Sequence, residues 1–194
     1  MRLRPIAALL LLGASLPLFS QSSPSAQQGG WPIVIGGGFS DFATDYHGSN
    51  RMEGISAWVD WNFYTAPHWL NGFGIEAEGH TIRFGVPGGF SQLREDTGEG
   101  GVIYTWRHYH DFHPYAKFLA GMGSIDFPAS GSYSHDTRHT VAPGGGMEFR
   151  TYRNIWVRAD YEYQFWHHIF GTQDLNPRGI TIGVSYDLRH IHRN

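Results

Sequence analysis

The sequence contains no cysteine, which excludes a disulfide framework and a lipid-modified cysteine anchor. Charged residues are only 16% of the chain, against about 25% in typical soluble domains. Lysine occurs once, at Lys117. Since a soluble surface is normally rich in Lys and Glu, a chain this poor in charge and 15% aromatic would expose large apolar patches to water. The composition favours strands that face lipid.

Long apolar runs are lacking after the first residues. No later segment has the roughly 18 apolar residues of a transmembrane helix, so a chain that spans a membrane must do so with strands. Residues 1–22 look like an export signal, because Arg2 and Arg4 precede an apolar stretch and small residues follow it. The alternative to an export signal is a membrane anchor, but the apolar stretch is too short to span a membrane. We therefore expect the signal to be cleaved between Ser20 and Ala26.

The charge balance is mildly acidic. Removal of residues 1–22 takes away two Arg and no acid, which changes the net charge from −3 to −5. A negative chain is a poor partner for nucleic acid, so we expect no nucleic-acid binding.

Eight segments alternate apolar and polar residues with period 2, and Gly, Pro, Asn, Asp and Ser separate them. They are residues 32–42, 53–64, 73–83, 99–108, 114–123, 138–152, 155–166 and 179–188. Long connections (43–52, 84–98, 124–137, 167–178) alternate with shorter ones (65–72, 109–113, 153–154). An up-and-down barrel with one long-loop rim has this pattern. We predict an all-β, eight-stranded antiparallel transmembrane barrel over residues 31–188 with a filled polar lumen.

A soluble barrel points its apolar face inward, whereas a membrane barrel points it outward toward lipid. The apolar face lacks charge in the middle of most strands, where a charge would be costly at the bilayer midplane. Aromatic residues crowd the predicted strand ends, as in an interfacial girdle: Trp61, Phe63, Trp69, Phe73, Trp106, Tyr115, Tyr152 and Trp156 at one rim, and Phe165, Trp166 and Phe170 at the other. We therefore expect Val157, Ala159, Tyr161 and Tyr163 to face lipid.

The opposite face carries acids and bases that would meet in a narrow lumen, where an unpaired charge is prohibitive. The predicted network consists of Asp60, Glu76, Glu78, Arg107, Lys117, Glu148, Arg150, Arg158, Asp160 and Glu162. Lys117 and Arg158 are its expected central bases.

Three stretches resemble the OmpA-like eight-stranded outer-membrane β-barrel proteins: Pro114–Gly123 (PYAKFLAGMG), Val157–Trp166 (VRADYEYQFW) and Leu175–Leu188 (LNPRGITIGVSYDL). The last is similar to the barrel-assembly signal of such proteins, on Thr181, Gly183, Tyr186 and Leu188. The resemblance implies a Gram-negative outer membrane, periplasmic termini, contact with lipid, lipopolysaccharide and the assembly machinery, and a monomer. The chain departs from the family by continuing past Leu188, and residues 189–194 are expected to be a short periplasmic tail without a peptidoglycan-binding domain.

Other motifs carry weaker predictions. His108, His110 and His113 have metal-binding side chains, but a polar turn explains them, and we expect no metal and no cofactor. The glycine triplets Gly36–Gly38 and Gly144–Gly146 lack the Lys-Ser/Thr of a phosphate loop and suit close approach inside strands.

One motif raises an enzymatic alternative. His47–Asn50 (HGSN) resembles the His-x-Ser-Asn motif of outer-membrane lipid A deacylases, and Glu53 offers the acid of a triad. That family carries the motif in the later half of its barrel, whereas here it lies in the first long loop, where Ser and Asn are ordinary.

We therefore expect no catalytic residues and no open pore, and a structural or surface-exposed role with long extracellular loops. The alternatives are an acyl hydrolase acting on lipid A and a secreted, lipocalin-like barrel with an apolar ligand.

Overall fold

The computed structural model describes residues 30–45, 51–63, 70–83, 93–129, 132–169 and 173–189. Nearly all of these residues lie in strands, which are β1 (Gly30–Ala43), β2 (Arg51–Asn62), β3 (Phe73–Arg83), β4 (Arg94–Thr105), β5 (Phe112–Ala129), β6 (Ser132–Tyr152), β7 (Ile155–Tyr163), β8 (Phe165–Ile169), β9 (Gln173–Leu175) and β10 (Arg178–Arg189). No helix among the described residues is long and apolar enough to cross a membrane. The expected export signal, residues 1–22, and residues 190–194 of the expected tail lie outside the described residues.

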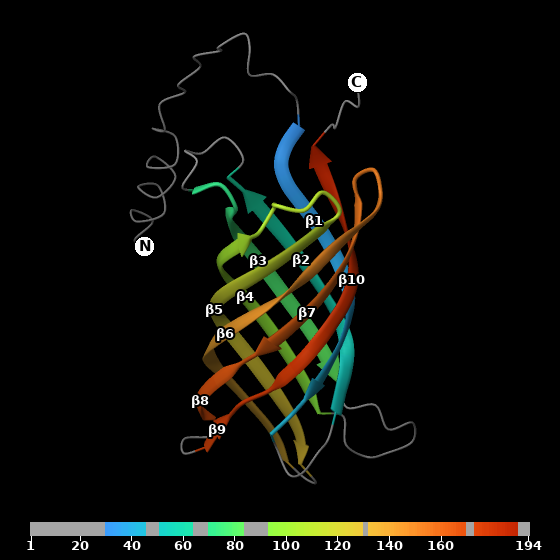
Figure 1. Cartoon of the computed structure of the whole chain (residues 1–194). Coiled ribbons are helices and arrows are strands. Elements are labelled where there is room, and N and C mark those ends of the chain that lie inside the picture. The colour runs from blue at the N-terminus through green and yellow to red at the C-terminus, as the bar shows by residue number, and fades with distance from the viewer. Residues whose placement is uncertain are drawn as a thin grey trace, which may run out of the picture.

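Eight of these strands form a closed antiparallel barrel (Figure 1). The eight strands of the barrel are β1 to β7 and β10. Each of them pairs with the next one in chain order, including β5 with β6 and β7 with β10, and the pairing of β10 with β1 closes the ring. The strands β8 and β9 extend the sheet from β6. Gly30 and Arg189 are paired, so both ends of the described chain lie at one end of the barrel, which we call the termini end. The opposite end is called the distal end. The predicted fold class is confirmed.

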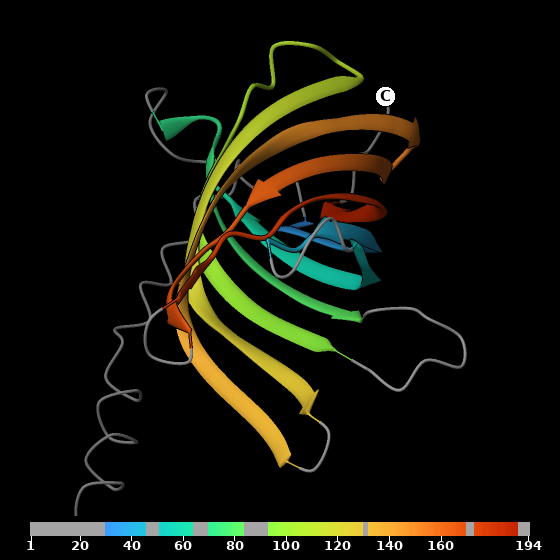
Figure 2. The ribbon, with the colours of Figure 1, turned by 90° about the horizontal axis from the view of Figure 1, so that it is seen from below.

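Several predicted strand boundaries are wrong at the distal end. β4 begins at Arg94, inside the predicted loop 84–98, and the predicted loop 124–137 is mostly paired, with only residues 130–131 between β5 and β6. Figure 2 shows these two strands running out together as a long hairpin. The predicted strand 155–166 is divided between β7 and β8, and β9 lies in the predicted loop 167–178. Polar, exposed residues are typical of loops, but ladder pairing satisfies their backbone groups here.

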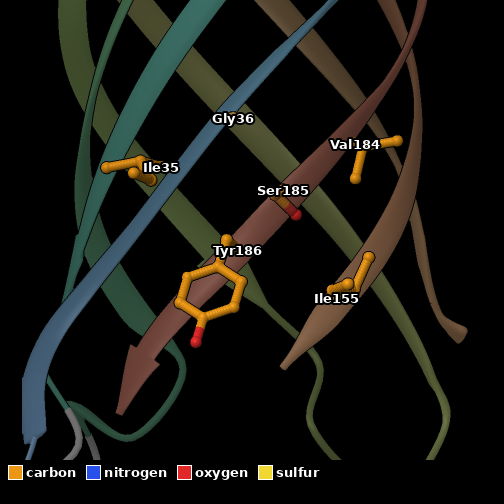
Figure 3. Close-up of a pocket in the computed structure, with 6 residues that line it drawn as sticks. All are labelled: Ile35, Gly36, Ile155, Val184, Ser185 and Tyr186. Atoms are coloured by element: carbon orange, nitrogen blue, oxygen red, sulfur yellow. The ribbon is translucent and has the colours of Figure 1, made fainter. Parts of the chain in front are cut away.

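The outer surface of the barrel is apolar, as the alternation predicts. Its exposed large side chains come from alternate positions of the strands and include Ile35, Phe39, Ile55, Val59, Ile75, Val102, Phe118, Met122, Tyr161, Ile180, Ile182 and Val184. Val157 and Tyr161 face outward, while Arg158, Asp160 and Glu162 are buried. A shallow apolar groove where β1, β10 and β7 meet belongs to the same outer surface (Figure 3).

The predicted aromatic girdle is correct only in part. Trp61, Phe73, Trp106 and Tyr152 are exposed near the termini end, where amphipathic rings suit a membrane interface. Phe63 and Phe165 are half-buried, and Trp69 and Phe170 lie outside the described residues. Tyr115, Trp156 and Trp166 are buried and point inward instead, because they occupy the polar phase of the alternation. These three residues are therefore a correction to the prediction.

An apolar layer closes the lumen at the distal end, and we call it the distal cap. It consists of two buried groups, which are Phe42, Met52 and Ile82, and Ile125, Trp166, Ile169 and Leu175. Leu93 packs against both groups. The Trp166 ring fills the space beside Gly123, where an added Cβ would lie 2.1 Å from the indole. The cap separates the lumen below it from the distal solvent.

Candidate functional site: the charged lumen

Lys117 lies at the centre of the lumen, on β5. Its Nζ atom is 2.8 Å from Asp160 Oδ2, 2.8 Å from Glu162 Oε2 and 3.4 Å from Glu76 Oε1. It also donates a hydrogen bond to Glu78 Oε2. The Lys117 side chain is fully buried, and its four acidic partners are at most 3% exposed. One ammonium therefore holds carboxylates from β3 and β7 together across the barrel.

Arg158, on β7, binds the layer of acids nearer to the termini end. Its Nη2 atom lies 2.8 Å from Glu76 Oε2 and 3.0 Å from Asp160 Oδ2, and Nη1 lies 3.4 Å from Asp60 Oδ2. Its Nε donates to the Tyr115 hydroxyl at 2.7 Å. The guanidinium also stacks over the rings of Trp58 and Tyr115, an environment that suits its planar, weakly hydrated charge.

Glycine makes room for these large inward side chains. An added Cβ at Gly36 would lie 2.2 Å from the Trp58 indole, and one at Gly146 would lie 2.7 Å from the Tyr115 hydroxyl. At Gly144 an added Cβ would approach the Lys117 stem at 2.9 Å. Both glycine triplets thus contain positions where a lumen side chain packs directly on the backbone of the wall.

On the distal side of Lys117 lies a second group of buried polar residues, which we call the distal chamber: Glu78, His80, Glu95, Glu99 and Glu162. His80 Nε2 lies 3.3 Å from Glu78 Oε1 and 3.8 Å from Glu162 Oε1. Glu99 accepts a hydrogen bond from Thr140 at 2.6 Å, and Glu162 accepts one from Gln164 at 2.8 Å. Both carboxylate oxygens of Glu95 lack a hydrogen-bond partner among the described residues.

At the termini end the polar groups are more open. Arg107 donates a 2.5 Å hydrogen bond to Asn62, and Arg150 lies over the Trp156 ring, with Asp111 at 3.8 Å. Glu148 is half-buried opposite Arg158 in the β6–β7 pairing. The predicted network is therefore divided. Asp60, Glu76, Glu78, Lys117, Arg158, Asp160 and Glu162 meet in the central lumen, while Arg107, Glu148 and Arg150 lie toward the termini end.

The residues of the other predicted sites are scattered. In the proposed assembly signal, Thr181 is buried and hydrogen-bonded to Ser40, while Tyr186 and Leu188 face outward. The backbone at Gly183 passes close to Gly37 and Gly38, so an added Cβ has no space. His108 and His110 are exposed, and His113 stacks on Trp156. His47–Asn50 lies outside the described residues.

Three chamber residues were missing from the predicted network. His80 follows Glu76 and Glu78 at the same period, so the alternation could have placed it in the lumen. Glu95 was assigned to a loop because strand 99–108 was started too late. Glu99 lies inside that strand and on the same face as Arg107, so the alternation that placed Arg107 in the lumen could have placed Glu99 there as well.

The charged lumen has the chemistry of a buried ion-pair network, and it contains more acids than bases. Within the described residues, Lys117 is the only Lys or Arg that contacts the chamber carboxylates of Glu78 and Glu162. Glu95 and Glu99 form no ion pair there. In the central lumen each acid therefore contacts Lys117 or Arg158, whereas Glu95 and Glu99 of the distal chamber contact neither base.

Comparison with solved structures supports the fold. The chain is similar to Ail, the attachment invasion locus protein of Yersinia pestis, with a TM-score of 0.60 and 18% identity over 81% of this chain and 99% of that one. It is also similar to Neisserial surface protein A, NspA (TM-score 0.67, 12% identity, 82% and 99% coverage). OprG of Pseudomonas aeruginosa gives a TM-score of 0.51 and 13% identity, with 82% and 97% coverage.

These identities establish the fold alone. A comparison with curated proteins gave no match. The apolar outer face and the charged interior are the reverse of a lipocalin-like barrel, so that alternative is wrong.

The model of the outer membrane protein beta-barrel domain matches residues 6–187, and the predicted resemblance to outer-membrane barrels is confirmed. The chain belongs to the outer membrane protein beta-barrel domain family, and it is a protein of the outer membrane.

Proposed function

We propose that this protein is a closed, monomeric barrel that presents its distal connections at the cell surface and conducts no ions. The distal end faces the outside, and the termini end faces the periplasm. Lipid and lipopolysaccharide surround the apolar outer surface. The assembly machinery recognises the last strand through Thr181, Gly183, Tyr186 and Leu188.

The observation that carries the proposal is the filled and capped lumen. Lys117 and Arg158 bridge the opposite walls through carboxylates, and the distal cap adds buried apolar side chains above them. An ion crossing the barrel would have to break several buried charge pairs and displace the Trp166 ring. Eight-stranded barrels generally have interiors just wide enough for side chains.

Conductance in planar lipid bilayers tests the closed lumen. The refolded full chain is expected to give no stepwise current under conditions in which a 16-stranded porin, whose lumen holds an aqueous channel, gives steps. Regular steps from the unmodified chain that disappear on its removal would contradict the proposal.

The orientation is tested by an epitope tag in intact cells. A tag between residues 130 and 131, in the β5–β6 connection, is expected to bind antibody without permeabilisation. The matched tag between Arg153 and Asn154, in the β6–β7 connection, should bind only after the outer membrane is opened. The reverse pattern would show that the termini end is outside.

A further inference from the structure

We propose that the distal chamber binds one Zn²⁺ ion through Glu78, His80 and Glu162. Each of these residues offers one ligand atom, and the three atoms lie within 4.8 Å of one another. Imidazole nitrogen and carboxylate oxygen are both zinc ligands. The site lies in the lumen, between Lys117 and the distal cap.

The spacing of the donor atoms fits zinc. Zinc bonds to His and Glu are about 2.0–2.1 Å, so the ligand atoms of a tetrahedral site lie roughly 3.3 Å apart. His80 Nε2 is 3.3 Å from Glu78 Oε1 and 3.8 Å from Glu162 Oε1. These two separations are close to that value, and all three ligand atoms lie within 4.8 Å of one another.

Other polar atoms of these ligands have partners in the lumen, and Glu162 Oε1 itself accepts a hydrogen bond from Gln164 Nε2 at 2.8 Å, which a bound ion would have to replace. Lys117 contacts the Oε2 atoms of both Glu78 and Glu162. His80 Nδ1 lies 3.2 Å from Ser40 Oγ, which in turn lies 2.8 Å from Thr181 Oγ1. With Nδ1–H donated to Ser40, Nε2 carries the lone pair, the usual outer-shell arrangement of a metal-binding histidine.

Unpartnered buried groups give independent support. His80 Nε2 and Glu78 Oε1 face each other at 3.3 Å, and both residues are at most 5% exposed. Glu95 is 0% exposed with both oxygens unpartnered, and it interacts electrostatically with His80 and Glu162. Glu99 stands directly opposite Glu78 in the β3–β4 pairing. A divalent cation would give these buried carboxylates a partner.

The chamber is closed on the distal side, so the ion would be taken up as the barrel folds. The test therefore refolds the full chain in detergent with and without Zn²⁺, removes excess metal by gel filtration, and measures zinc per chain by mass spectrometry. We expect one zinc per chain and a higher urea midpoint of unfolding after refolding with Zn²⁺, because an ion bound only by the folded state stabilises it.

The variant His80→Gln is expected to lose bound zinc and the zinc-dependent shift of the midpoint. Loss of a direct ligand should weaken binding by more than the roughly 10–100-fold caused by loss of an outer-shell partner. The control His108→Gln removes an exposed histidine at the termini end and should keep both. If His80→Gln does not fold, Glu162→Gln replaces it.

Two results would overturn the proposal. One is an unmodified chain that retains no stoichiometric zinc and shows no midpoint shift, which would mean that protons balance the chamber charge. The other is equal zinc retention by the unmodified chain and by the folded ligand variant. Neither result bears on the closed-lumen proposal, which conductance tests separately.

Discussion

The variant Lys117→Met tests the charge pairing of the lumen most directly. The substitution keeps an unbranched side chain of similar length and removes the ammonium. In the folded protein this ammonium is fully buried and contacts the carboxylates of Glu76, Glu78, Asp160 and Glu162. Its loss leaves these acids without their shared partner, in surroundings that water does not reach.

The expected magnitude follows from these contacts. At the 2.8–3.4 Å separations of Lys117 Nζ, each attraction is worth roughly 5–6 kcal/mol with an effective dielectric constant of about 20. Desolvation of the ammonium and repulsion among the acids offset most of this sum. Removal of one partner from a buried ion pair typically costs about 3–5 kcal/mol. We expect Lys117→Met to lower the free energy of unfolding by that amount.

The assay is urea-dependent unfolding and refolding in detergent, followed by tryptophan fluorescence and heat-modifiable gel mobility. The control Arg51→Met breaks the exposed Arg51–Asp41 pair and should cost less than about 1 kcal/mol. Adding Glu78→Gln to Lys117→Met should recover about 1–3 kcal/mol, because it removes one uncompensated charge. The reasoning is refuted if Lys117→Met costs no more than Arg51→Met.

Three further predictions concern packing, the outer face and assembly. Gly36→Ala places a Cβ 2.2 Å from the Trp58 indole and should lower the free energy of unfolding in urea by about 1–3 kcal/mol. The control is Gly98→Ala, where an added Cβ meets nothing within 4 Å. Equal losses of stability in the two variants would contradict the close-packing argument. Ile182→Arg, on the outer face in the middle of β10, should lower the free energy of unfolding in lipid vesicles by about 2–4 kcal/mol. Tyr152→Arg, at a strand end, should lower it by only about 0–1 kcal/mol. A larger loss for Tyr152→Arg than for Ile182→Arg would mean that the bilayer midplane does not lie at the middle of β10. The double variant Tyr186→Ala/Leu188→Ala should reduce the amount of folded protein in outer-membrane fractions. The control Ile55→Ala/Val59→Ala, on the same outer surface, should not reduce it. Equal amounts of folded protein for the two double variants would contradict a role of the last strand in assembly.

The central strands and their faces could be predicted from the sequence because period-2 alternation is a local property. Residues 73–83 form β3 within the predicted limits, and Val157, Arg158 and Asp160 occupy the predicted faces. The scarcity of lysine and of charge indicated that the apolar face meets lipid, since a water-exposed barrel needs a polar exterior. These inferences require no knowledge of which strands are neighbours.

Boundaries and packing at the distal end required the tertiary structure. Glu95 looks like a loop residue, but it is paired opposite Ile82 on β3, and β4 therefore begins before it. Trp166 has the position of a girdle residue in the sequence, yet it is 0% exposed in the distal cap. Gly123 gives its ring space, and Ile125, Ile169 and Leu175 pack around it.

The amino-acid sequence alone therefore determined a membrane barrel with two-faced strands and a charged interior, because burial, charge and alternation are readable residue by residue. Only the tertiary structure decided which acids share each base. Lys117 and Glu78 are 39 residues apart in sequence, and Arg158 and Asp60 are 98 apart. Their contacts depend on the register of the closed sheet, which sets the height of every inward side chain and divides the lumen into a paired centre and an acidic distal chamber.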